Sequence, residues 1–364
     1  MTVAELGEHA LLARLLARLP RPAASVLVGP GDDAAVLTPV RNERLVVTTD
    51  AVVEGVHFSR AYSTPADIGH KALAVNLSVL AAMAATPRWA LLSLVLPGNW
   101  LVADVEALVD GLSALAGRHG VSVVGGNITR TDGPLVVDVT AGGDVRSRRW
   151  LTRSGAVAGD DVWVSGTLGA AAAGLEMLRD RAPGAGRRAP ENLSGFTEPG
   201  ARSPEPGSVC ITRQRRPEPR VRLGVAMGRA RAARAAMDLS DGLADALRQV
   251  AAASGCGVRI DGNALPIEPE AAEWWRRQGV DAVGATLAGG EDYELLFAVP
   301  KRGGGRIRNV TRRVADPPLT KIGTFTKDTA LIVERAGREE ELPLGYEHFG
   351  ARSSGFDRKQ NENR

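Results

Sequence analysis

Four short segments rich in glycine and aspartate, each where a predicted strand meets a turn, most constrain how this chain can fold. Glycine lets the backbone approach a ligand closely, and aspartate at a strand end is a common way to hold phosphates and hard cations. One such segment alone is most often a turn or a helix N-cap. Four in one chain predict strand ends that converge on a single site. They are residues 29–33, 48–50 (continued by 55–58), 237–242 and 289–294.

Strand and helix patterns alternate between these segments, which is typical of an α/β or α+β fold. With 364 residues, we expect two domains, at 1–147 and 148–350. The end of the second domain reads as β-rich. Strands are expected at 26–28, 34–37, 45–49, 89–96, 121–124, 135–145, 161–165, 235–239, 257–260 and 293–299, and helices at 3–18, 64–85, 102–117, after 166–169, and at 222–234, 241–253 and 270–288.

The helix at 64–85 has the clearest start signal. Thr64 is the expected N-cap, Pro65 occupies the first helical position, and Asp67 stands three residues after the cap. The helix is rich in alanine and leucine, so we interpret it as core rather than as a binding surface.

The composition of the sequence changes between residues 181 and 222, where proline, glycine, serine and arginine dominate. Such a composition buries too little apolar surface to offset the entropy of ordering, so it predicts a flexible insert. The polar residues 351–364 predict a disordered tail.

Charge and cysteine content exclude several classes of protein. Lysine and arginine total 45 against 42 acidic residues, a net charge of only +3, and the arginines are scattered, so a nucleic-acid partner is not expected. Cys210 and Cys256 are too few for a disulfide scaffold and favour reduced thiols in the cytoplasm. We see no run long enough to span a membrane and no secretory signal, so no membrane association is expected.

Separated aspartates beside threonine hydroxyls indicate oxygen ligands, and therefore Mg²⁺ rather than Zn²⁺. Asp238 and Asp241 stand at the start of a predicted helix, where the dipole favours a phosphate or a metal–phosphate complex. Neither a Cys/His cluster nor a Ser-His-Asp arrangement is evident. The pattern therefore favours phosphoryl transfer, which needs positioning and charge neutralisation rather than covalent catalysis.

The order of motifs G-D-D-A-A-V, T-T-D-x-x-x-E-G-x-H-F, K-A-L-A-V-N-L-S, V-G-G-x-x-T-R, L-T-R-S-G-A, M-D-L-S-D-G-L and G-G-E-D-Y-E-L resembles the thiamine-monophosphate kinase family, part of the phosphoribosylaminoimidazole synthetase superfamily. The resemblance covers about residues 3–350, apart from the insert. It implies a two-domain fold whose N-terminal domain forms a β-barrel with a dimer mate, and hence a homodimer. It also implies an ATP-dependent, Mg²⁺-assisted phosphorylation of thiamine monophosphate to thiamine diphosphate.

The resemblance assigns site residues by position. The implied Mg²⁺ ligands are Asp33, Thr48, Thr49, Asp50, Asn127, Asp238 and Asp241. The implied ATP contacts are Gly126, Asn127, Arg153 and Ser240, and the implied substrate contacts are His57, Glu291 and Tyr346.

The chain departs from the family pattern at two positions. Val79 and Asn127 stand where the family has Mg²⁺-binding aspartates. Asn127 keeps a carbonyl oxygen, whereas Val79 cannot coordinate, so we expect a loss on the order of 10²-fold in rate. The alternative is a non-catalytic or weakly active homologue that retains nucleotide or thiamine phosphate binding. Selenophosphate synthetase is disfavoured, because residues 1–30 contain neither cysteine nor lysine.

Overall fold

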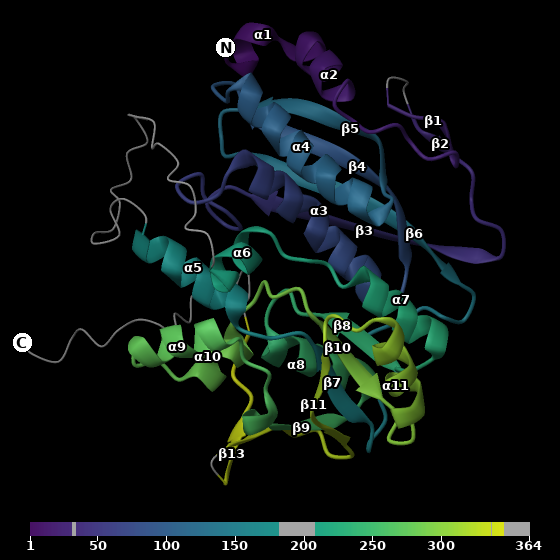
Figure 1. The fold of residues 1–364 in the computed structure, drawn as a ribbon, viewed down its shortest axis with the longest axis vertical. Coiled ribbons are helices and arrows are strands. Elements are labelled where there is room, and N and C mark those ends of the chain that lie inside the picture. Colours follow the sequence, from purple (N-terminus) through teal and green to yellow (C-terminus); the bar gives the residue numbers. More distant parts are fainter. Residues whose placement is uncertain (31–33, 182–207, 336, 346–364) are drawn as a thin grey trace, which may run out of the picture.

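The computed structural model describes residues 1–30, 34–181, 208–335 and 337–345. Its two larger sheets come from separate stretches of the chain, residues 43–146 and 161–341, and lie at opposite ends of the molecule (Figure 1). The fold is therefore mixed α/β, as expected. No helix in these described stretches is both long and apolar enough to cross a membrane.

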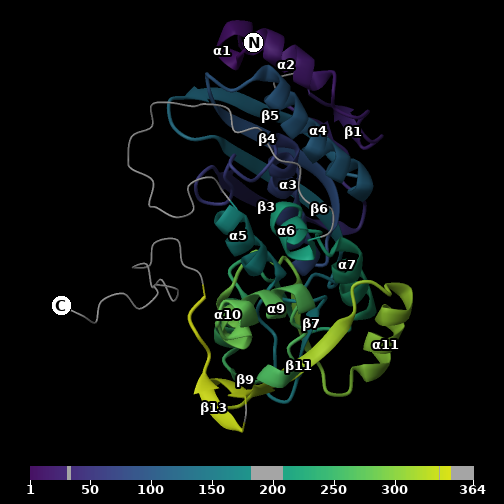
Figure 2. The same ribbon diagram turned by 60° about the vertical axis from the view of Figure 1, so that its left-hand side comes forward.

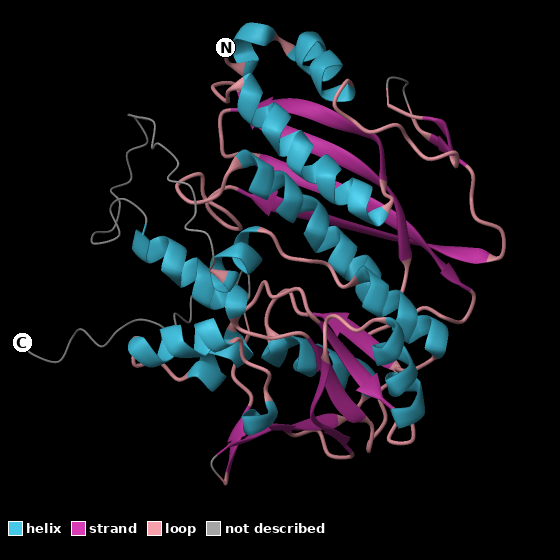
Figure 3. Ribbon diagram, in the orientation of Figure 1, coloured by secondary structure: helices cyan, strands magenta, loops and turns pink. Residues whose placement is uncertain are grey.

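The first sheet has the strand order β3-β6-β4-β5. Helices α3 (Pro65–Ala82) and α4 (Val102–His119) cover one of its faces (Figure 3). The other face presents Leu45, Val47 and Leu91, which are 61%, 53% and 36% exposed. The strands are β3 (Glu43–Val53), β6 (Val136–Arg146), β4 (Thr86–Pro97) and β5 (Ser122–Thr131), antiparallel except for the β4–β5 pair.

Helix α3 begins as its sequence predicts. Thr64 Oγ1 accepts from the backbone N–H of Asp67, and Asp67 Oδ2 accepts from that of Thr64, both at 3.2 Å. The helix ends at Ala82 rather than near residue 85, because Ala84 has a positive φ of 58°. Residues 67–78 are all buried, because α3 packs against the first sheet and α4 and also against α7 and β8 of the second half.

The second sheet has seven strands in the order β13-β12-β9-β11-β7-β10-β8. Only the β12–β9 pair is parallel. The strands are β7 (Asp161–Ser165), β8 (Ala235–Asp238), β9 (Gly257–Asp261), β10 (Leu295–Val299), β11 (Leu319–Thr326), β12 (Leu331–Arg335) and β13 (Arg338–Glu341). The helices are α5 (Ala170–Arg181), α6 (Val209–Arg215), α7 (Val221–Ala230), α8 (Leu243–Ser254), α9 (Pro269–Arg277), α10 (Ala282–Ala288) and α11 (Gly304–Arg313), with a short 3₁₀ turn η1 (Gly262–Ala264).

One apolar core joins the two halves. Leu295 and Phe297 of β10 belong to the same cluster of buried residues as Leu73 and Leu77 of α3. This shared core places the loops that flank β8 and β10 beside α3, and so determines where the two halves meet.

The N-terminal helix predicted over 3–18 is broken in the structure. Gly7 has a φ of 83°, and it separates α1 (Val3–Leu6) from α2 (Glu8–Leu16). The two-stranded ribbon of β1 (Val26–Val28) and β2 (Val36–Leu37) follows. The stretch at 270–288 is likewise two helices, α9 and α10, and α11 was not expected at all.

The prediction of a flexible insert over 181–222 is wrong for residues 208–222. Helix α6 occupies 209–215 and α7 begins at Val221 (Figure 2). Cys210 and Ile211 pack in a core cluster with Met177 of α5 and Trp275 of α9, so apolar residues distant in sequence stabilise α6. The rest of the predicted insert, 182–207, and the predicted tail, 351–364, lie outside the described residues.

Candidate active site

Helix α3 brings two of the predicted metal ligands together. Ser78 Oγ donates to Asp238 Oδ2 at 2.9 Å, at the end of β8, in a buried hydrogen bond. Two residues earlier, Asn76 Nδ2 approaches the backbone oxygen of Asp50, on β3, at 3.5 Å. The two strands belong to different sheets, so this convergence is produced by tertiary packing.

Asp50, Asp238 and Asp241 form an acidic cluster. The pKa of Asp50 is raised to about 6, mainly by burial and also by the negative charges of Asp238, Asp138 and Asp241. Burial likewise raises the pKa of Asp238 to about 6, although the hydrogen bond from Ser78 opposes the shift. The carboxylates are therefore held where their negative charges are poorly compensated, which favours a bound cation.

The donor set of this cluster fits a hard divalent cation. Carboxylate oxygens predominate, and the buried Asn76 Oδ1 has no hydrogen-bond partner among the described residues. No three His, Cys, Asp or Glu side chains in the described stretches already stand together as a metal site, and Asp33 lies outside those stretches. Mg²⁺ does not need such a cage, because it commonly binds one or two carboxylates together with water and substrate phosphates.

The third and fourth Gly/Asp-rich segments lie side by side. The backbone N–H of Glu291 donates to Ser240 O at 2.6 Å, and that of Tyr293 donates to Leu239 O at 3.0 Å. A Cβ at Gly290 would lie 2.5 Å from Ser240 O, so only glycine permits this approach. Burial raises the pKa of Tyr293 well above its ordinary value, and the charges of Glu291 and the acidic cluster raise it further.

Two of the predicted substrate residues are linked through a buried lysine. Lys71 Nζ, on α3, lies 2.7 Å from Glu291 Oε1 and donates to the backbone oxygen of His57 at 2.9 Å. His57 Nδ1 accepts from the backbone N–H of Val53 at 3.1 Å, which places the proton of the neutral ring on Nε2. Gln214 Nε2, on α6, donates to Glu291 Oε2 at 2.7 Å.

The predicted nucleotide contacts of the second half also lie beside the acidic cluster. The positive charge of Arg153 opposes the rise that burial causes in the pKa of Asp238. Arg153 Nη1 donates to Gln249 Oε1 at 2.5 Å. Ser240 Oγ donates to Asp241 Oδ2 at 3.2 Å. Because α8 begins at Leu243, this loop precedes a helix N-terminus, as expected.

Among the other predicted ligands of the first half that the structure describes, Thr49 and Asn127 do not join the cluster. Thr48 shares a face of β3 with Asp50, whereas Thr49 points to the opposite, open face and donates to Asp138 Oδ1 at 3.0 Å. Asn127 is exposed on the edge strand β5, and its Nδ2 donates to Thr129 Oγ1 at 3.1 Å.

Gly126 lies beside Asn127 on β5, and a Cβ there would stand 1.8 Å from Leu92 O, so this glycine is needed for strand packing. The predicted residues Asp33 and Tyr346 are outside the described residues.

Sequence reasoning missed the residues that organise the site from α3 and α6, namely Lys71, Asn76, Ser78 and Gln214. Lys71, Asn76 and Ser78 are polar positions in a helix otherwise made largely of alanine and leucine. Such side chains need partners when the helix is buried, and that need was the available signal. Gln214 had none, because it lies in the stretch predicted to be flexible.

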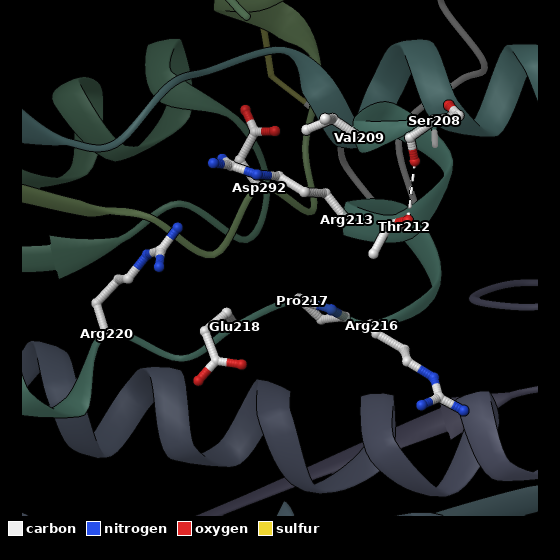
Figure 4. Close-up of a pocket in the computed structure, with 9 residues that line it drawn as sticks. All are labelled: Ser208, Val209, Thr212, Arg213, Arg216, Pro217, Glu218, Arg220 and Asp292. Carbon is white, nitrogen blue, oxygen red and sulfur yellow. Dashed lines mark hydrogen bonds between the residues drawn. The ribbon is translucent and has the colours of Figure 1, made fainter. Parts of the chain in front are cut away.

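A cavity of about 380 Å³ lies beside α6 but not at the acidic cluster. Figure 4 shows Arg213 reaching toward Asp292 at its wall. Asp292 accepts from the backbone N–H groups of Gly169 and Ala171, and so caps the start of α5. Arg213 and Arg220 both pair with the fully buried Glu294. These charges are already matched within the protein, so we assign the cavity no ligand.

Comparison with known proteins defines the class of this fold and site. Residues 31–145 match the family described as AIR synthase related protein, N-terminal domain, and residues 158–335 match AIR synthase related protein, C-terminal domain. The chain is thus an AIR synthase related protein with the two-domain mixed α/β fold of that class.

More specific relatives narrow the assignment. Thiamine-monophosphate kinase of Escherichia coli (strain K12) is 38% identical over 356 residues, covering 94% of this chain and 98% of the relative. The crystal structure of thiamine-monophosphate kinase from Stenotrophomonas maltophilia K279a is 39% identical, with a TM-score of 0.73 over 90% of this chain and 95% of that one. AaThiL complexed with AMPPCP and TMP is 32% identical, with a TM-score of 0.70 over 96% and 99%. The chain belongs to the thiamine-monophosphate kinase family.

Proposed function

We propose that this protein transfers the γ-phosphoryl group of ATP to thiamine monophosphate, giving thiamine diphosphate and ADP. One observation carries the proposal: the structure of a relative that aligns with 96% of this chain, at 32% identity, has been solved with AMPPCP and TMP. The acidic cluster supports it, because carboxylates gathered beside a helix N-terminus suit a magnesium–nucleotide complex.

Asp50, Asp238 and Asp241 would hold Mg²⁺. Asp33, Thr48, Thr49 and Asn127 are the further proposed ligands for several Mg²⁺ ions; the side chains of Thr49 and Asn127 do not join the acidic cluster, so they would not share its ion. Bound Mg²⁺ would neutralise charge on the transferring phosphoryl group. Arg153, Ser240, Gly126 and Asn127 are the proposed ATP contacts.

His57, Glu291 and Tyr346 are the proposed contacts to thiamine monophosphate. An oxygen of its phosphate attacks the γ-phosphorus of ATP, and an O–P bond forms as the bond to the bridging oxygen of ADP breaks. That oxygen leaves with ADP. No enzyme nucleophile is needed, so the residues of the chain act by orienting the two phosphates.

We also propose a homodimer in which the open face of the first sheet forms a barrel with its mate. The exposed Leu45, Val47 and Leu91 support an apolar contact there. The proposed domains remain 1–147 and 148–350. Two free, buried cysteines suit the reducing cytoplasm, where we place the reaction.

One observation favours a second candidate, a homologue that binds these ligands without turnover. Val79 directly follows Ser78, the residue that contacts Asp238, and its side chain is only half-buried. An apolar side chain therefore directly follows the residue that contacts the acidic cluster, at the position of a family aspartate.

The deciding experiment incubates purified protein with ATP, thiamine monophosphate and a series of Mg²⁺ concentrations, and follows thiamine diphosphate. Turnover supports the kinase. Absence of turnover at every Mg²⁺ concentration, with thiamine monophosphate still bound in calorimetry, supports the second candidate. Absence of both turnover and binding overturns both.

A further inference from the structure

We infer that Lys71 and Gln214 are positioning residues that hold Glu291 in the orientation in which it contacts the substrate. The inference rests on the proposed function, because it concerns recognition of thiamine monophosphate at that same site. Lys71, Gln214 and Glu291 are called the clamp below.

The clamp joins three parts of the chain that are remote in sequence. Lys71 comes from α3, Gln214 from α6, and Glu291 from the loop before β10. Each oxygen of the Glu291 carboxylate has its own contact: Oε1 forms an ion pair with Lys71 Nζ at 2.7 Å, and Oε2 accepts from Gln214 Nε2 at 2.7 Å. An ion pair on one oxygen and a hydrogen bond on the other restrain the rotation of the carboxylate as well as its position.

Lys71 also ties the clamp to the other predicted substrate residue. Its ammonium group donates to the backbone oxygen of His57, while its side chain is only 4% exposed. One buried cation thus sets the separation between the loop after β3 and the loop before β10. Loss of Lys71 would release both loops together.

Two features of the clamp are energetically unfavourable. Glu291 has a φ of 67°, a left-handed conformation that is unfavourable for a residue with a Cβ. Gln214 turns its amide nitrogen to Glu291, which leaves its buried Oε1 without a hydrogen-bond partner among the described residues. Neighbouring costs of this kind, concentrated on one carboxylate, point to a functional orientation rather than to stability.

The contacts also define what Glu291 can recognise. A carboxylate accepts about four hydrogen bonds; Gln214 donates to Oε2, whereas the buried Oε1 has an ion pair but no hydrogen-bond donor among the described residues. The remaining acceptor directions suit an N–H or O–H donor of the substrate. Because Lys71 already balances its charge, Glu291 acts by directed hydrogen bonding more than as a counter-ion.

The test compares the steady-state kinetics of the wild type with those of Lys71→Met. This substitution keeps much of the length of the side chain and removes its charge. We expect KM for thiamine monophosphate to rise about 10-fold or more, because Glu291 loses its charged partner, while KM for ATP and kcat change less than about 3-fold. Lys71→Arg should restore part of the loss. Lys321→Met is the control, because Lys321 also makes a 2.6 Å ion pair, with Asp161, but its side chain is half-exposed and lies in the second sheet.

A double variant separates positioning from a general structural role. If Lys71 acts through Glu291, then Lys71→Met combined with Glu291→Gln should have the same KM for thiamine monophosphate as Glu291→Gln alone, within about 2-fold. Equal increases in both KM values, or fully additive effects, would overturn the inference. If thermal unfolding shows that Lys71→Met does not fold, Gln214→Leu is measured in its place against the same expectation.

Failure of the proposed function is recognised separately. A wild-type protein without turnover contradicts the kinase, and the clamp is then tested by calorimetric titration with thiamine monophosphate. A dissociation constant raised about 10-fold in Lys71→Met and unchanged in Lys321→Met supports the clamp; equal constants in both overturn it.

Discussion

The acidic cluster and the clamp lie against the same helix, yet their carboxylates differ in whether they have partners of opposite charge. Asp50 and Asp238 have no ion pair in the part of the chain that the structure describes, and burial raises the pKa of each to about 6. Glu291 has a lysine and an amide donor, and the neighbouring Glu294 has two arginines.

The difference distinguishes carboxylates with uncompensated charge from carboxylates with matched charge at one interface. Carboxylates near other carboxylates are costly in the free protein and gain the most when a cation arrives. Carboxylates with matched partners hold loops at a fixed separation and gain little from added charge. Removing a carboxylate should therefore damage activity in the first group, and substrate orientation or stability in the second.

The largest expected effect is on activity, at Asp238. Asp238→Asn keeps the size of the side chain and removes a proposed Mg²⁺ ligand, so we expect turnover to fall by about 10²- to 10³-fold. The midpoint of thermal unfolding should stay the same or rise, because one repelling buried charge is gone. A large loss of stability with turnover retained would contradict the comparison.

Glu294→Gln tests the opposite case. It leaves Arg213 and Arg220 without their shared buried carboxylate, so the free energy of unfolding should fall by about 3 kcal/mol in denaturant titration. Glu273→Gln is the control, because its pairs with Arg276 and Arg277 are solvent-exposed, and its transition should match that of the wild type. Similar transitions for all three proteins would show that the Glu294 pairs contribute nothing to stability.

Adding the two aspartates of the family pattern tests the same comparison by a gain of negative charge rather than by a loss. Val79→Asp adds a charge on α3 directly after Ser78, which contacts Asp238, whereas Asn127→Asp adds one on β5. We expect the double variant to turn over about 10-fold faster, or to need about 10-fold less Mg²⁺, with most of the gain from Val79→Asp. An unchanged Mg²⁺ dependence would show that position 79 does not influence metal binding.

The smallest effect is the pH dependence of stability without metal. Asp50 and Asp238 have folded pKa values of about 6 against an ordinary 3.8, so the folded chain binds more protons than the unfolded chain between these values. Their contribution to stability is complete below about pH 3.8 and is lost as pH rises through 6.

In EDTA, the thermal midpoint should therefore rise by a few degrees from pH 7 to pH 5.5, and by less in Asp238→Asn. Equal slopes for the two proteins would contradict the raised pKa of Asp238.

Local signals predicted the elements whose stabilising contacts are local. The start of α3 is predicted by Pro65 at its first position and by the hydrogen bonds between Thr64 and Asp67 within one turn. Helix α6 was missed because Cys210 is buried by residues from α5 and α9, which no local composition reveals. The face of Thr49 was predictable in principle, because adjacent residues of a strand point to opposite sides.

Composition, motif order and periodicity were sufficient for the fold class, the family and most of the residues proposed to act, because these depend on residue type and spacing. The meeting of Asp50 with Asp238 through α3, and of Glu291 with Lys71 and Gln214, depended on packing between distant segments. Burial and Coulomb interactions act through space, so only the folded chain could distinguish carboxylates whose charge is uncompensated from those that already have charged partners.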